Sequence, residues 1–354
     1  MSLIWKLLNR AQLSERREDG RISVRDLDVF YFTGSKQKRS KVKDMSATGV
    51  YLHTDERWQP GTCVLLTLQR TGFMGQRAGA PVRLRAKSVR IADDGVGLTF
   101  VPEPLNAVAW RGLMTTAATL NKRLPHAQED VVGQFRIAKA LAFLIRICPS
   151  AEAPMLKLIT ETMSDERAIR AIEMALKAEE LIEAQPAPAA NLVSQEVFLR
   201  TVEVGSEAKD ELMRQSWAGM LASFCLATDK SSNQRHMDLL VQLLPGHVQI
   251  LNLACTRAWQ LGWGPGFVFP EDILCPANYL RQLTGIRDLA GVEQDLNHLH
   301  HLGLLEPTAR ANAFEHIADA NITPTGLGLK LFARCRGQAE PPEAPDAKTL
   351  QMAS

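Results

Sequence analysis

The sequence has little that would place the protein in a membrane or in an oxidising compartment. No window of its 354 residues approaches the ~20 apolar residues of a transmembrane helix. The apolar stretch at residues 3–8 is short and interrupted by Lys6, so we expect no secretory signal. The six cysteines are scattered without a Cys-x-x-Cys pair, which argues against a zinc ribbon or a redox dithiol. We therefore expect a cytoplasmic protein with reduced cysteines, no metal and no cofactor.

Signals for catalysis are also missing. No phosphate-binding loop, Ser/His/Asp set or paired-carboxylate motif stands out, so the sequence predicts a protein that is not an enzyme. The formal net charge of +2 gives no indication of a nucleic-acid partner. The charge is uneven, however, because residues 14–101 contain 16 Lys/Arg and 10 Asp/Glu. The excess of positive charge therefore lies near the N-terminus.

Hydrophobic residues make up 45% of the chain, which is enough to build buried cores, and the length favours two or three domains. Between residues 22 and 100, short apolar and β-branched runs alternate with Gly, Pro and Asp turn signals. Strands are expected at 29–33, 49–53, 63–69, 82–91 and 97–101. Short strands at this spacing predict a small antiparallel barrel, and a helix is expected next, at residues 105–124.

Two polar motifs stand on either side of the first expected strand. Arg17 and Arg21 form an Arg-x-x-x-Arg motif, and Asp44 opens an Asp-x-Ser-x-x-Gly motif. This pair of motifs, in a strand-rich segment, resembles the PilZ domain, the receptor module for the bacterial second messenger cyclic di-GMP. The resemblance covers about residues 14–120 and implies a six-stranded antiparallel barrel followed by a helix. It assigns cyclic di-GMP binding to Arg16, Arg17, Arg21, Asp44, Ser46 and Gly49.

The chemistry of cyclic di-GMP suits these side chains. The planar guanidinium of arginine matches the O6/N7 edge of guanine and also clamps phosphate oxygens. An ionised aspartate accepts hydrogen bonds from guanine N–H groups, serine donates or accepts, and glycine permits a tight backbone beside the ligand. Glu18 and Asp19 lie between the arginines and could neutralise them. The alternative is a solvated arginine cluster and a purely structural turn, but the two motifs together favour ligand binding.

After residue 125 the pattern is helical, with apolar residues at three- and four-residue spacing. Residues 186–190 read as a short Pro/Ala linker, and residues 262–276, with three glycines and three prolines, are expected to be irregular. Helices are expected at 131–148, 155–162, 165–184, 193–203, 209–227, 237–244, 246–261, 289–302 and 323–335.

The fold class is therefore multidomain α+β, an antiparallel barrel followed by an all-α region. We expect these parts: an N-terminal segment (1–13), the barrel with its helix (14–124), a helical region (125–185), the linker (186–190), a second helical region (191–336) and a disordered tail (337–354). At about 286–336 the outline is that of a winged helix, with a helix ending at Gly303 and a hairpin from residues 304–306 and 314–318.

The second helical region also resembles the Abi-alpha family, which is linked by name to abortive phage infection. The likeness rests on Trp-Ala-Gly-Met-Leu-Ala-Ser at 217–223, on His236 and on Leu-Leu-Pro at 243–245, and it spans about residues 190–335. These are residues of the core type. The resemblance therefore implies a fold and brings no catalytic set.

The helix expected at 288–302 bears on two other functions, DNA binding and metal binding. It contains no Lys or Arg, so the sequence favours protein contact over DNA contact for a winged helix. His298 and His301 have the i, i+3 spacing of metal ligands, but no third ligand follows at a suitable spacing. A solvated or interface helix face is therefore favoured over a metal site.

Together these patterns predict a non-enzymatic receptor. The barrel would bind cyclic di-GMP, and the helical half would relay the bound state to a protein partner, with no membrane span. One alternative is a phage-defence or interaction protein whose barrel is a degenerate, non-binding scaffold. Another is a winged-helix DNA-binding regulator.

Overall fold

The computed structural model describes residues 27–71, 77–101, 107–123, 131–185, 192–227, 231–261, 272–307 and 319–339. The chain divides into two compact units, Met1–Ala142 and Phe143–Ser354. This division falls within a single helix, α3 (Val131–Ile147). The expected segment at 1–13, the linker at 186–190 and residues 340–354 of the expected tail lie outside the described residues.

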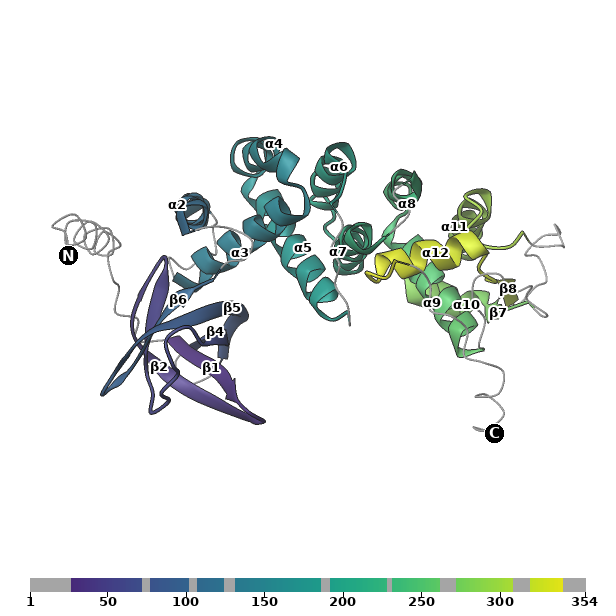
Figure 1. Cartoon of the computed structure of the whole chain (residues 1–354). Coiled ribbons are helices and arrows are strands. Elements are labelled where there is room, and N and C mark those ends of the chain that lie inside the picture. Colours follow the sequence, from purple (N-terminus) through teal and green to yellow (C-terminus); the bar gives the residue numbers. More distant parts are fainter. Residues whose placement is uncertain are drawn as a thin grey trace. The chain divides into compact units, whose positions relative to one another are not determined.

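The first unit contains the predicted closed barrel of six antiparallel strands (Figure 1). They are β1 (Leu27–Thr33), β2 (Lys36–Ser46), β3 (Gly49–His53), β4 (Cys63–Thr71), β5 (Arg77–Ala92) and β6 (Gly95–Phe100). The strands pair in the order β1-β2-β3-β6-β5-β4, and pairing of β1 with β4 closes the barrel. Alternate apolar side chains fill the interior, among them the fully buried Val29, Leu52, Leu66 and Val96.

The hydrophobic pattern does not reveal strand β2. Five of its eleven residues are Lys or Arg, and its buried side chains are those of Ser40, Val42 and Met45. Carboxylates pair with four of the cations: Lys38 with Glu56, Arg39 and Lys41 with Asp28, and Lys43 with Asp94. Exposed ion pairs contribute little individually. Backbone pairing with β1 and β3, rather than an apolar period of its own, therefore defines this strand.

Helix α2 (Ala107–Arg123) follows the barrel close to its predicted place, and α3 comes next. Trp110 of α2 and Phe135 of α3 are both buried. The ring centroids of Phe135 and the barrel residue Phe100 are 4.9 Å apart, and those of Trp110 and Phe135 are 6.2 Å apart. This aromatic cluster packs both helices against the barrel.

The second unit is mostly helical (Figure 1). After the end of α3 it contains η2 (Pro149–Ala151), α4 (Glu152–Lys157), η3 (Leu158–Thr162), α5 (Asp165–Glu183), α6 (Gln195–Gly205), α7 (Glu211–Leu226), α8 (Ser231–Val241), α9 (Pro245–Gln260), β7 (Leu274–Pro276), α10 (Ala277–Thr284), α11 (Leu289–His301), β8 (Asp319–Asn321) and α12 (Gly326–Cys335). In the part of this unit that the structure describes, the helices pack against one another, and α5, α9 and α12 contact α7.

Parts of this unit differ from the expectations. Residues 274–276, expected to be irregular, form strand β7, because their backbone pairs with that of β8. Helix α10 is not predicted, since it has only eight residues and buries only two of them, Ala277 and Leu280. Helix α8 begins at Ser231 and ends at Val241, six and three residues earlier than expected. The winged-helix hairpin is not confirmed: residues 308–318 lie outside the described residues.

Two general features complete the description. Among the helices of the described stretches, none has both the length and the apolar character needed to cross a bilayer. The six cysteines form no disulfides, and all but Cys63 and Cys335 are buried.

Candidate ligand-binding surface

A register shift between Val42 and Asp44 decides which side chains β2 presents outward near its end. Val42 and Met45 are both buried in the barrel, so the shift reverses the alternation and puts Asp44 and Ser46 on the outer face. Both are partly exposed, and Ser46 pairs with Gly49 across the turn that joins β2 to β3. The structure thus brings the Asp, Ser and Gly of the motif together in one hairpin.

Gly49 is required by a close approach of the neighbouring strand. A Cβ at this position would lie 2.4 Å from the carbonyl oxygen of Leu98 in β6. The tight backbone expected at Gly49 is therefore a contact between β3 and β6, and it is not a left-handed turn conformation, because Gly49 does not have a positive φ.

A cluster of charged groups surrounds Tyr51, the cross-strand neighbour of Asp44. The Lys43 ammonium and the Arg90 guanidinium each lie 5.1 Å from the centre of the Tyr51 ring. The Tyr51 hydroxyl donates to Asp94 Oδ1 at 2.5 Å, and Lys43 Nζ lies 2.6 Å from Asp94 Oδ2. Gly97 leaves room for Arg90, since a Cβ there would lie 2.9 Å from the Arg90 Cγ. The outer face beside the motif is therefore organised and carries both signs of charge, with the cations Lys43 and Arg90 and the carboxylates of Asp44 and Asp94.

This cluster shifts two ionisation equilibria. Hydrogen bonds from Lys43 and Tyr51 lower the pKa of Asp94 to about 2. The hydrogen bond to Asp94 raises the pKa of the Tyr51 phenol, and desolvation adds to the effect. Sequence reasoning missed these residues, because Asp94 was explained by the turn before β6. The available signal was the position of Tyr51, which alternates outward between two buried residues, Val50 and Leu52.

The hairpin is also fastened to helix α2. The indole Nε1 of Trp110 donates to the carbonyl oxygen of Ala47, at 2.9 Å, and Ala47 lies inside the motif. In the same turn, Thr48 accepts from the backbone N–H of Phe100 at 2.9 Å. Because Trp110 is only 2% exposed, the indole has little freedom to leave this position. A change in the hairpin conformation would therefore alter its contact with α2.

The first motif lies elsewhere in the chain. Arg16, Arg17 and Arg21 are outside the described residues, so the structure does not place them relative to Asp44. Their assignment to the ligand stays a prediction.

The histidines of α11 form contacts of a different kind. The His298 ring stacks on the ring of His247 at 4.7 Å, and His247 Nε2 lies 3.1 Å from Asp295 Oδ1. His247 Nδ1 accepts from the backbone N–H of Leu244 at 3.0 Å. Burial lowers the pKa of His247. Within the described stretches, no group of three or more His, Cys, Asp or Glu side chains is arranged to hold a metal ion. The helix face contacts α9 and the end of α8.

The N-terminal unit is thus a small antiparallel barrel that presents a polar hairpin on its outer face. Residues 15–110 match the family model of the PilZ domain, a match that covers the barrel and the start of α2. A comparison with curated proteins found no match. The resemblance of residues 190–335 to the Abi-alpha family stays a prediction.

Proposed function

We propose that the barrel is a receptor for cyclic di-GMP and that the chain acts as a signalling protein rather than an enzyme. One observation carries the proposal: in a segment that matches the PilZ domain, the hairpin presents Asp44 and Ser46 together on the outer face of the barrel. The carboxylate of Asp44 would accept from guanine N–H groups, and Ser46 would complete the polar edge.

Part of the positive charge for a dianionic ligand would come from beside the hairpin, where Lys43 is itself paired with Asp94. Lys43 and Arg90 lie against Tyr51, directly across from Asp44. Arg16, Arg17 and Arg21 would add guanidinium groups for the guanine O6/N7 edge and the phosphates. A few charge-assisted contacts of ~1.5–3 kcal/mol each would supply the ~8 kcal/mol of micromolar binding.

The route from the site to the helical unit would begin at Trp110. Its indole holds the hairpin carbonyl of Ala47, and its ring packs beside Phe135 of α3. Helix α3 continues without a break from the first compact unit into the second. We infer that ligand binding at the hairpin shifts α2 and, through it, α3. This requires the two positions of α2 to differ in ligand affinity.

The output would be contact with a protein partner at the end of the helical unit. The order α9, β7, α10, α11, β8 and the pairing of β7 with β8 support a winged-helix-like module there. Helix α11 carries no Lys or Arg, so it lacks the phosphate contacts on which DNA affinity depends. A protein partner therefore fits this module better than DNA.

Calorimetric titration with cyclic di-GMP tests the receptor proposal. The expected result is micromolar binding that is lost in Arg17→Ala, Arg21→Ala and Asp44→Ala. Arg83→Ala is the matched control, since Arg83 is an exposed cation of β5 whose cross-strand partner is Thr67. All variants should retain cooperative thermal unfolding. The absence of both binding heat and thermal shift at saturating ligand would overturn the proposal.

The relay has its own test. Trp110→Phe keeps an aromatic ring but removes the hydrogen bond to Ala47, a loss of ~0.5–1.5 kcal/mol that should weaken ligand binding only several-fold. Hydrogen exchange of α2 and α3 should respond to cyclic di-GMP in the original protein and respond less in the variant. Equal responses in both proteins would show that Trp110 does not connect the site to the helices.

A further inference from the structure

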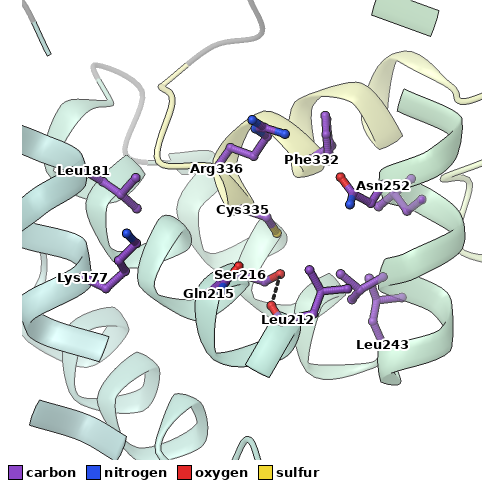
Figure 2. Close-up of a pocket in the computed structure, with 12 residues that line it drawn as sticks. Lys177, Leu181, Leu212, Gln215, Ser216, Leu243, Asn252, Phe332, Cys335 and Arg336 are labelled. Carbon is purple, nitrogen blue, oxygen red and sulfur yellow. Dashed lines mark hydrogen bonds between the residues drawn. The ribbon is translucent and has the colours of Figure 1, made fainter. Parts of the chain in front are cut away.

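The helical unit contains a partly open cavity lined by residues of that unit alone. It lies between α5, α7, α9 and α12 (Figure 2). Its volume is about 280 Å³. This is close to the lower end of ligand-pocket volumes, ~300 Å³. At ~30 Å³ for each water-sized group, the cavity has room for roughly nine non-hydrogen atoms. Its size therefore suits a small molecule.

The inner walls are apolar. Leu243, Val248, Leu251 and Phe332, which line the cavity, are each less than 9% exposed. Among the polar lining groups, the Ser216 hydroxyl donates to the carbonyl oxygen of Leu212 at 2.8 Å. Burial raises the pKa of the Cys335 thiol to about 12, so this group is neutral at physiological pH. The interior would therefore favour an uncharged, aliphatic part of a ligand.

One polar group in the wall has no partner. Asn252 is partly buried, and its amide makes no hydrogen bond with any residue in the described part of the chain. Figure 2 shows this amide extending from α9 toward the side chains of α12. An amide has two donors and an acceptor, so it can bind a polar ligand atom near Phe332.

An exposed cation lies at the edge of the same cavity. The Arg336 guanidinium lies 5.5 Å from the centre of the Phe332 ring and 5.9 Å from that of Trp259. A cation–π contact of this kind uses the ring face and leaves N–H groups available to a ligand. Within the described stretches, no carboxylate pairs with Arg336, whereas Lys177, the other cation of the lining, pairs with Glu180 at 3.2 Å. The edge thus offers one uncompensated positive charge.

We propose that this cavity binds a small monocarboxylate with an unbranched aliphatic chain of about six to eight carbons. The carboxylate would bind the Arg336 fork and approach Asn252, and the chain would lie against Leu243, Val248 and Leu251. A single negative charge matches the one unpaired cation. A phosphate ester would bring a second negative charge, for which the lining offers only Lys177, and Lys177 already pairs with Glu180.

Sodium octanoate is the probe, titrated against the full chain by ligand-observed NMR. Saturable one-to-one binding is expected, with a dissociation constant on the order of 0.1–1 mM. Octylammonium chloride, of the same length and opposite charge, and butyrate, with the same head and a short chain, should both bind much more weakly. Equal binding of octylammonium, or no binding of octanoate at several millimolar, would overturn the proposal.

Two variants test the assignment from opposite ends of the ligand. Arg336→Gln removes the carboxylate partner and should weaken octanoate binding roughly ten-fold or more. Leu251→Trp fills the apolar end and should abolish binding. Arg200→Gln is the matched control, because Arg200 pairs with Asp238 and does not line the cavity. Circular dichroism verifies folding, and octanoate affinity unchanged in a folded Arg336→Gln would overturn the assignment of the head group.

Discussion

The barrel carries a cluster of exposed charges on the outside of a closed sheet, whereas the helical unit buries several of its titratable residues. On the barrel, the charged groups of Lys43, Arg90 and Asp94 lie beside the motif hairpin and cover the Tyr51 ring, which is only 3% exposed. In the helical unit, Glu179, His236 and His247 are each at most 5% exposed. The first arrangement leaves charge in reach of a ligand or a partner. In the second arrangement, a change in protonation or packing directly affects the stability of the fold.

This difference has a consequence for stability. Surface charges are screened by solvent and salt, so the barrel can carry its exposed charges at little cost to its fold. Buried polar groups need their partners, and close-packed helices tolerate little change of volume. Substitutions in the two units should therefore have effects of different size, and the following expectations test the contrast.

The largest effect is expected for Trp217→Ala in helix α7. Trp217 is 2% exposed and among the largest buried side chains of the described chain. Removal of an aromatic side chain from a core costs ~3–5 kcal/mol, so urea unfolding followed by circular dichroism should show a loss of this size. Leu244→Ala is the control, because Leu244 is 62% exposed and should change stability by no more than ~0.5 kcal/mol. A loss below ~1 kcal/mol for Trp217→Ala would contradict close packing around α7.

A smaller effect is expected where glycines let backbones touch. A Cβ at Gly219 would lie 1.9 Å from the carbonyl oxygen of Cys335, and one at Gly49 would lie 2.4 Å from that of Leu98. Each Gly→Ala substitution should cost about 1–3 kcal/mol, because the backbones must separate. Gly49→Ala should also weaken cyclic di-GMP binding, whereas Gly219→Ala should leave it unchanged.

The control for both is Gly112→Ala in helix α2. No atom lies within 4 Å of the added Cβ, so the substitution should stabilise the protein by roughly 0.5–1 kcal/mol through helix propensity. Urea unfolding measures stability and calorimetry measures binding. Destabilisation by Gly112→Ala as large as that by Gly49→Ala would show that crowding is not the cause.

The same contrast explains how far the sequence could be interpreted. The barrel strands with alternating apolar residues were predicted, and so was the helix now seen as α2. Strand β2 was not, because its outward cations hide a pattern that only its neighbours complete. The Asp44, Ser46 and Gly49 hairpin follows from a local motif, but the Tyr51 cluster joins side chains from three strands and the β5–β6 turn. Contacts between distant residues have no local signature.

The helical unit shows the same limit more strongly. Its long helices follow from apolar spacing, whereas β7 depends on a partner far along the chain, β8. The cavity combines residues from four helices and neighbouring segments. The place of Arg336 at its edge is recognised only from the contacts with the rings of Trp259 and Phe332. Nothing in a sequence of core-type residues could distinguish this cavity from a filled interior.

A decrease in pH should affect the thermal stability of the two units differently. Burial lowers the pKa of His236 and of His300, both in the helical unit. Histidine with a lowered folded-state pKa stabilises the fold fully above its ordinary value of ~6.5, and this contribution is lost as pH falls through the folded pKa. The melting temperature of the helical unit should therefore fall between pH 7 and 5, as measured by calorimetry.

Variants identify the groups responsible for this acid response. His236→Gln should flatten the pH dependence of the helical transition, since a neutral amide cannot be protonated in this range. His53→Gln serves as the comparison, because His53 is an exposed residue of the barrel and lacks the burial on which the expectation depends. A pH profile that His236→Gln does not alter would show that other groups control the response.

The smallest effect is expected for Asp94→Asn on the barrel surface. The pKa of Asp94 is about 2 because Lys43 and Tyr51 hydrogen-bond its carboxylate. A carboxyl group with a lowered folded-state pKa stabilises the fold fully above its ordinary value of about 3.8, and this contribution is lost as pH falls toward 2. The stability difference between the original protein and Asp94→Asn should therefore be present at pH 6 and disappear near pH 2. Because the group is exposed, the difference should be small and should shrink at high salt.

Asp93→Asn makes this measurement specific, since Asp93 stands in the same turn but does not contact Lys43 or Tyr51 in the described structure. Its substitution should produce no comparable loss between pH 6 and pH 2. Tyr51→Phe, which removes one of the two hydrogen bonds to Asp94, should reproduce part of the Asp94→Asn effect. If Asp94→Asn instead lowered stability as much as a core substitution, the barrel would depend on its surface cluster for folding. The separation between a recognising surface and a supporting interior would then apply to the helical unit alone.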